Sequence, residues 1–188
     1  MANRNTQGFG LVPAGTLGST PATSGQGKYK IDAGSTTTLY HGGAVASDAG
    51  YIVDGQTTDA PILGVLNGIF YNDATTLKPT FANFYKQPIT PANSEDIDAF
   101  VFDNPQQQYV VATDATVAQA GFLETYDMNT SAGSDTTGQS SATLDIGDTS
   151  ADAASFRLLR VAEDPENEDI SAAFASVVVC INLIELQS

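Results

Sequence analysis

Short hydrophobic runs separated by turn residues make up most of the chain, and they are densest between residues 62 and 113. Within this block the runs ILGVLNGIFY, FANFYK, DAFVF and QYVVAT are bounded by Gly, Pro, Asn and Asp. Strands of four to eight residues with such boundaries are typical of antiparallel β-structure. The block therefore predicts a β-scaffold, and none of its residues has the pattern of an activated nucleophile or a set of metal ligands.

Further strands are expected on both sides of this block. They comprise residues 28–31, 37–41, 44–46 and 51–53 before it, and residues 122–128, 142–146 and 156–164 after it. The run SAAFASVVVCINLIEL (171–186) is hydrophobic on both faces of an alternating pattern and rich in β-branched residues, which predicts a central strand buried on both sides. Residues 114–121 are expected to form one or two helical turns, starting at Asp114 and ending at Gly121.

These patterns predict a mainly β fold, an antiparallel β-barrel or sandwich with an extended N-terminal arm and at most one short helix. A chain of 188 residues suffices for one domain with a hydrophobic core or for two small ones, and residues 28–188 are expected to form the β-rich body as a single domain. The sequence does not decide between barrel and sandwich.

Residues 1–27 are expected to form the arm, because they are rich in Gly, Thr, Ser, Ala and Pro. Only Phe9, Leu11, Val12 and Leu17 are large hydrophobic residues there, too few to offset the entropy of ordering such a segment alone. Two interpretations stay open. The arm orders along a partner subunit, with Phe9, Leu11 and Val12 as its contacts, or it is an unordered terminus.

Charge is unevenly distributed and changes the expected partners. The net charge is -15, but the first 31 residues hold three bases and no acid, whereas the remainder holds all 22 acids and four bases. A body this acidic repels nucleic acid and anionic membranes, so neither is an expected partner. No run has transmembrane length, and the first residues lack the hydrophobic segment of a secretory signal.

The chain offers little for catalysis or metal binding. A catalytic triad would have to use His41, the only histidine, and a zinc site from His41 and Cys180 would lack two ligands. Cys180 lies within VVVCINLI and is expected to be a small buried hydrophobic residue. The acidic clusters at 95–98, 145–152 and 163–169 are interpreted as solvated turns, with cation bridging between subunits as the alternative. No enzyme activity and no cofactor are expected.

Five segments follow one another in a characteristic order. They read ANRNTQGFGLVP, ILGVLNGIFYND, FANFYKQPITP, AFVFDNPQQQYVV and ASFRLLRVAEDPEN, followed by the final hydrophobic strand. This order resembles a family of structural proteins encoded by tailed bacteriophages, often beside the major capsid protein gene. The resemblance covers most of the chain and is a match of pattern, without a catalytic signature.

The resemblance implies a virion protein of the capsid decoration, or cement, type, located on the outer surface of the head and assembled in the host cytoplasm. Its expected partners are the major capsid protein and further copies of itself, arranged as a homotrimer because such proteins occupy symmetric lattice points. Phe9, Leu11 and Val12 are the residues expected to bind a partner.

The alternative function is a tail- or vertex-associated adhesin that binds through surface aromatic residues such as Tyr71, Phe84 and Tyr85. A cell-wall hydrolase is a poorer fit, because the chain has one histidine, one cysteine and no tryptophan. A shell-forming capsid subunit is also a poorer fit, because the chain shows no sustained helical periodicity.

Overall fold

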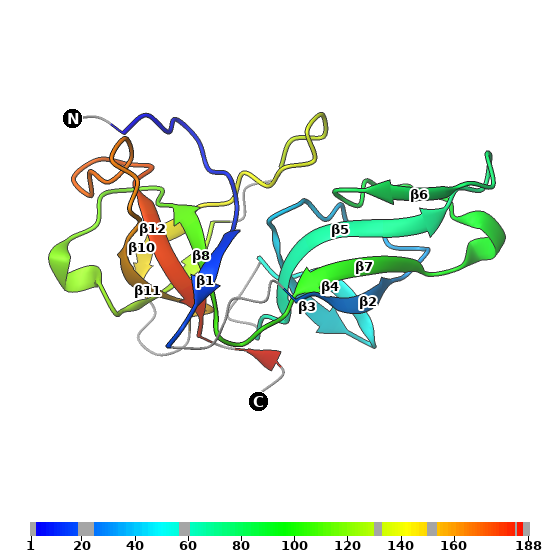
Figure 1. The fold of residues 1–188 in the computed structure, drawn as a ribbon, viewed down its shortest axis with the longest axis horizontal. Helices are drawn as coiled ribbons and strands as arrows, with labels where there is room; N and C mark the ends of the chain where they lie inside the picture. Colours follow the sequence, from blue (N-terminus) through cyan, green and yellow to red (C-terminus); the bar gives the residue numbers. More distant parts are fainter. Residues whose placement is uncertain are drawn as a thin grey trace.

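Two antiparallel six-stranded sheets, sheet A and sheet B, form two lobes that lie side by side (Figure 1). The computed structural model describes residues 3–18, 25–56, 61–129, 133–149, 154–182 and 184–185. The predicted mainly β, antiparallel fold is confirmed, and the described residues form no closed barrel. The only helical elements of the described residues are two single 3₁₀ turns, η1 (Ala92–Ser94) and η2 (Gln119–Gly121). Of the one or two helical turns predicted at 114–121, the structure has only η2.

Strand order differs between the two sheets. Sheet A runs β1 (Val12–Thr16), β8 (Gln107–Ala112), β12 (Ser176–Ile181), β11 (Phe156–Val161), β9 (Thr125–Met128) and β10 (Leu144–Thr149). Sheet B runs β2 (Gly27–Ile31), β7 (Ile97–Phe102), β5 (Gly64–Asn72), β3 (Ala44–Asp48) and β4 (Tyr51–Asp54), and β6 (Pro79–Ala82) also pairs with β5. Strands from the first and last thirds of the chain thus meet in sheet A.

The strand β12 holds the middle of sheet A and is buried on both faces, as the sequence predicts. Val177 and Val179 point into a hydrophobic core with Phe156 and Leu158, while Cys180 points to the opposite face and is also buried. The strand is shorter than predicted, because Phe174 has a positive φ of 60° and interrupts the extended backbone before it.

Sheet B encloses a second hydrophobic core, built on the long strand β5. Leu66 and Ile69 of β5 pack there with Ile97 and Val101 of β7, all without exposed surface. The hairpin from β3 to β4 closes through Ala49 and Gly50, with positive φ angles of 50° and 89°. Such a two-residue turn matches the twist of the strands that it joins.

The two lobes share buried residues. Ala44, Ile62 and Val65 belong to the sheet B half of the chain, yet they pack in the core of sheet A with Tyr109. The hydroxyl of Tyr109 in β8 donates to the carbonyl of Phe102 at the end of β7, 3.0 Å away. Burial raises the pKa of this tyrosine far above its ordinary value. The junction between the lobes is therefore closely packed.

Residues 3–18 lie extended against their own chain. Val12–Thr16 form β1 at the edge of sheet A, and before it the amide of Leu11 donates to the carbonyl of Gly42 at 2.7 Å. Further back, the Arg4 guanidinium pairs with Glu166 at 2.7 Å. The part of the predicted arm that the structure describes is thus ordered by contacts within one chain.

The strand predicted at 37–41 is wrong, since these residues make only isolated bridges at Leu39 and His41. Gly42 follows with a positive φ of 76° and turns the chain away. The strand predicted from FANFYK is mostly wrong as well: β6 ends at Ala82. Beyond it the chain turns inward so that Tyr85 is buried and its hydroxyl donates to the Ser35 carbonyl at 2.8 Å.

Leu11 and Val12 are neighbours that differ sharply in burial, at 1% and 44% exposed. We expect Leu11→Ala to lower the free energy of unfolding by about 3 kcal/mol, because it leaves a cavity in the core of sheet A. Val12→Ala should cost less than about 1 kcal/mol, since little buried surface is lost. Urea unfolding followed by circular dichroism measures both values, and equal losses would contradict the packing of this segment against its own chain.

Candidate binding face

A row of four side chains crosses the face of sheet B that points away from its core. Phe81 of β6 lies opposite Phe70 of β5, Phe70 lies opposite Asp98 of β7, and Asp98 lies opposite Lys30 of β2. Directly opposed residues of antiparallel strands share a face and are in contact distance. This surface, which includes the pocket described below, is named the outer face of sheet B.

A glycine in the next row lets the Phe81 ring lie flat against the sheet. Gly68 of β5 lies opposite Phe100 of β7, and a Cβ atom on Gly68 would come within 2.7 Å of the Cζ atom of Phe81. The rings of Phe81 and Phe100 lie 6.1 Å apart, a distance at which tilted rings attract one another. Phe81 nevertheless stays 62% exposed, so the two rings present a hydrophobic surface to solvent.

Two lysines of β2 converge on one carboxylate of this face. The Nζ atoms of Lys28 and Lys30 lie 2.7 Å and 2.6 Å from the carboxylate oxygens of Asp98. Burial acts to raise the pKa of Asp98, but the bonds to Lys28 and Lys30 outweigh it and hold the pKa below its ordinary value. Asp98 thus stays ionised and ties β2 to β7.

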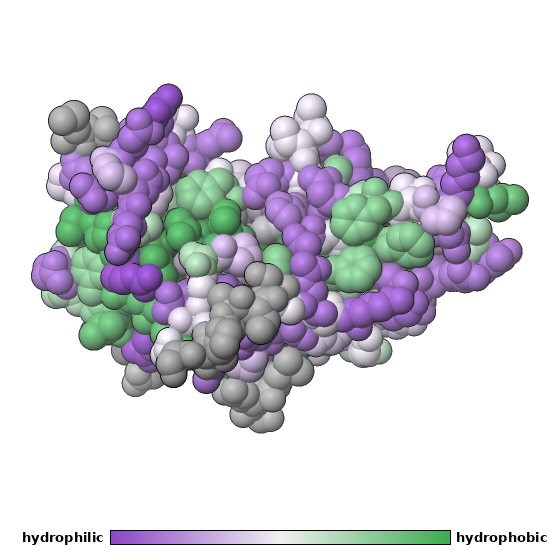
Figure 2. Space-filling view, viewed as in Figure 1, coloured by the Kyte–Doolittle hydropathy of each residue, from purple (hydrophilic) through white to green (hydrophobic). Residues whose placement is uncertain are grey.

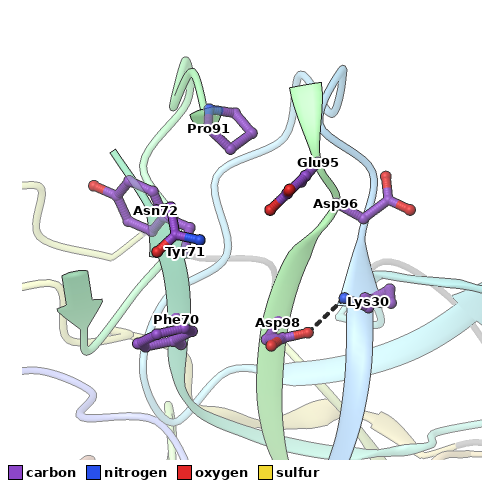
Figure 3. Close-up of a pocket in the computed structure, with 8 residues that line it drawn as sticks. All are labelled: Lys30, Phe70, Tyr71, Asn72, Pro91, Glu95, Asp96 and Asp98. Atoms are coloured by element: carbon purple, nitrogen blue, oxygen red, sulfur yellow. Dashed lines mark ion pairs between the residues drawn. The ribbon is translucent and has the colours of Figure 1, made fainter. Parts of the chain in front are cut away.

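A pocket of about 290 Å³ opens beside this row, at the end of β5 and the start of β7 (Figure 3). Its lining is aromatic and aliphatic on one side and acidic on the other, and comprises Lys30, Phe70, Tyr71, Asn72, Pro91, Glu95, Asp96 and Asp98. Glu95 and Asp96 are exposed, and no lysine or arginine in the described ranges forms an ion pair with either. In Figure 3 the Glu95 side chain points across the pocket toward β5.

The hairpin that joins β5 to β6 ends in an exposed hydrophobic residue. Leu77 is 73% exposed and has a positive φ of 54°, a conformation that costs a leucine energy. Asp73 fixes the loop, because its Oδ1 atom accepts hydrogen bonds from the amides of Thr75 and Thr76 at 3.0 Å and 2.7 Å. The tip is therefore a defined turn that holds Leu77 outward.

Sheet A also carries hydrophobic side chains on the face opposite its core. Val12 of β1 lies opposite Val110 of β8, which lies opposite Val178 of β12. Figure 2 shows hydrophobic surface over this part of sheet A and again over β5, β6 and β7, on the same side of the molecule. The two areas are separated and bordered by hydrophilic residues.

The three residues predicted to bind a partner do not share one surface. Leu11 lies in the core of sheet A and Val12 on the outside of β1, because successive strand residues point to opposite faces. Phe9 is half-buried, and its carbonyl accepts a hydrogen bond from the Nε2 atom of Gln139 at 2.7 Å. Of the three, Val12 is the side chain most available to a partner in this conformation.

The reactive residue types are spread over the fold. His41 is half-buried and its Nδ1 atom lies 2.8 Å from the carbonyl of Asn67. Cys180 is buried as predicted, and burial raises the pKa of its thiol. In the part of the chain that the structure describes, no three His, Cys, Asp or Glu residues are arranged to hold a metal ion. No helix there has the length and hydrophobicity needed to cross a bilayer.

The aromatic residues considered for an adhesin are not grouped on the surface. Tyr85 is fully buried, so its prediction as a surface residue is wrong. Phe84 stacks on Tyr40 with ring centroids 5.9 Å apart, and Tyr71 packs partly against the core of sheet B. Phe81 is instead exposed beside the half-buried Phe100, and the alternation of DAFVF could have placed Phe100 on the same face as Asp98.

Comparison with known proteins gives no relative from which a function could be transferred. No family model, no curated protein and no solved structure matches this chain.

The ion pairs of Asp98 generate a prediction about pH. Asp98→Asn should lower the free energy of unfolding by about 1 kcal/mol at pH 7, because Lys28 and Lys30 lose their shared partner. Since the folded-state pKa lies below the unfolded value, the stabilisation is complete above about pH 4 and is lost as pH falls through the folded-state pKa. Urea unfolding at pH 7 and pH 2.5 measures this difference.

The exposed neighbour Asp96 supplies a control for this measurement. Its carboxylate accepts only a 3.2 Å hydrogen bond from the Tyr51 hydroxyl, so Asp96→Asn should change stability much less at pH 7. A loss for Asp98→Asn that stays the same at both pH values would show that the lost packing, and not the charge, causes it.

Proposed function

We propose that this protein is a capsid decoration, or cement, protein of a tailed bacteriophage. In this proposal it binds the outer surface of the head, bridges subunits of the major capsid protein and assembles as a homotrimer. It acts by binding and carries out no catalysis. The chain-long resemblance described above supplies the protein class, and the molecule supplies a physical route to binding.

The observation that carries the proposal is the display of two hydrophobic areas on one side of the molecule (Figure 2). Exposed hydrophobic patches bordered by polar residues are typical of protein interaction sites. Removing such surface from water favours association, although the entropy cost of docking offsets part of the gain. Two areas on two lobes suit a broad, flat partner, and the surface of a protein shell is such a partner.

The overall charge supports the same role. A net charge of -15 keeps copies that do not touch a partner from aggregating. Solubility at high local concentration is a requirement for a protein that covers a lattice with many copies. The alternative of an adhesin is weakened by the burial of Tyr85 and by the stacking of Phe84 on Tyr40.

The number of copies per particle tests the function directly. Quantitative mass spectrometry of purified particles of the source phage should find this chain in amounts comparable to the major capsid protein, because a cement protein occupies repeated lattice sites. A handful of copies per particle would favour a tail or vertex location and the adhesin alternative. Absence from particles would refute the proposal.

A further inference from the structure

An exposed hydrophobic seat and a pocket for a positive charge adjoin on the outer face of sheet B. The seat consists of Phe81 and Phe100, with Phe70 beside Phe81 in the same row. Phe70 also lines the acidic pocket, so no strand separates the two features. One short partner segment spans both, because neighbouring strands are only about 5 Å apart.

The tip of the β5–β6 hairpin carries a further exposed hydrophobic side chain on the same lobe. Leu77 adopts a positive φ of 54° and exposes 73% of its surface, although glycine or asparagine would tolerate that backbone at less cost. Strain of this kind, combined with exposure of a large hydrophobic side chain, points to a role in contact rather than in folding.

Charge identifies the kind of partner. Lys28 and Lys30 both bond to Asp98, and no lysine or arginine of the described residues forms an ion pair with Glu95 or Asp96, so these five groups together carry a charge of -1. The opposite wall of the pocket offers the ring of Phe70. A carboxylate that points across a pocket toward an aromatic ring suits an arginine, because a guanidinium forms paired hydrogen bonds with a carboxylate and stacks on a ring.

A second copy of this chain fits this face poorly. Each copy carries a net charge of -15, and like charges brought together at an interface cost energy. Four of the seven basic residues are already held by carboxylates in their own chain: Arg4, Lys28, Lys30 and Lys86. The charge of the face therefore favours a basic partner over self-association.

We propose that the outer face of sheet B binds a segment of a basic partner protein. In the bound state an arginine enters the pocket between Glu95 and Phe70, and hydrophobic neighbours of that arginine cover Phe81 and Phe100. The identification of the partner as the major capsid protein rests on the proposed function. The recognition chemistry itself rests only on the geometry of this face.

The first test uses synthetic peptides and the full-length protein. Acetyl-Ala-Leu-Arg-Leu-Ala-amide is titrated into ¹⁵N-labelled protein, and amide shifts are followed by NMR; acetyl-Ala-Leu-Gln-Leu-Ala-amide is the matched neutral probe. The arginine peptide should shift amides of β5 and of residues 95–98 and bind at least fivefold more tightly than the glutamine peptide. Equal binding of the two peptides, or no shifts in these segments, would overturn the proposal.

Variants then separate the seat from the pocket. Phe81→Ser and the double variant Glu95→Gln with Asp96→Asn should each weaken binding of the arginine peptide at least fivefold. Leu123→Ser is the control for the seat, since Leu123 is also 62% exposed but lies on the sheet A lobe. Glu163→Gln with Glu168→Gln is the control for charge, since it removes the same two charges from that lobe. Test variants that bind as tightly as these controls would overturn the proposal.

Binding to heads connects this face to the proposed function. Undecorated heads of the source phage should bind the Phe81→Ser variant at least tenfold more weakly than the Leu123→Ser control in a sedimentation assay. Normal binding of Phe81→Ser to heads would remove this face from capsid recognition while leaving the cement role intact. Absence of the protein from phage particles would refute the cement role, whereas the peptide titration would still decide the recognition chemistry.

Discussion

The packed junction between the two lobes is the constraint on which the rest of the structure depends. Ala44, Ile62 and Val65 come from the sheet B half of the chain but complete the core of sheet A. The Tyr109 hydroxyl and the Phe102 carbonyl add a buried hydrogen bond across the same junction. Because interiors of this kind are densely packed, rotation of one lobe against the other would open cavities. The two hydrophobic outer areas therefore keep a fixed relation on one side of the molecule.

In sheet B, the alternation of side chains along each strand places hydrophobic residues both in the core and on the outer face. In β7, Ile97 and Val101 point inward, while Asp98 and Phe100 point outward. The outward residues are not a random polar surface, since Asp98 joins two strands through Lys28 and Lys30 and Phe100 supports the Phe81 ring. The same two-residue period that builds the core of sheet B thus also builds its outer face.

A structural feature was predictable from the sequence where it depends on residues close together in the chain, and not where it depends on distant ones. The burial of β12 on both sides was predictable, because dense β-branching and hydrophobicity on both alternations lie within six residues. The burial of Leu11 was not predictable, because it depends on contact with Gly42 and on strands formed about a hundred residues later. The strand predicted from the aromatic run FANFYK was wrong for the same reason. The Tyr85 hydroxyl donates to the distant Ser35 carbonyl, and its ring packs in the core of sheet B. The pocket combines residues from β2, β5 and the start of β7, a proximity that only strand pairing reveals.

The distribution of basic residues is the basis on which a basic partner, and not merely a hydrophobic one, is proposed for this face. Lys28 and Lys30 sit on the outer face, where free lysines would have attracted acidic surfaces. The Asp98 carboxylate compensates the charge of only one of these two lysines, so Lys28, Lys30, Asp98, Glu95 and Asp96 together leave a charge of -1 at the edge of the hydrophobic seat. In the proposed complex, hydrophobic contact at the seat supplies affinity without selecting a partner, whereas the remaining charge disfavours copies of the same acidic chain. Affinity and selectivity on this face thus come from adjacent but chemically distinct groups.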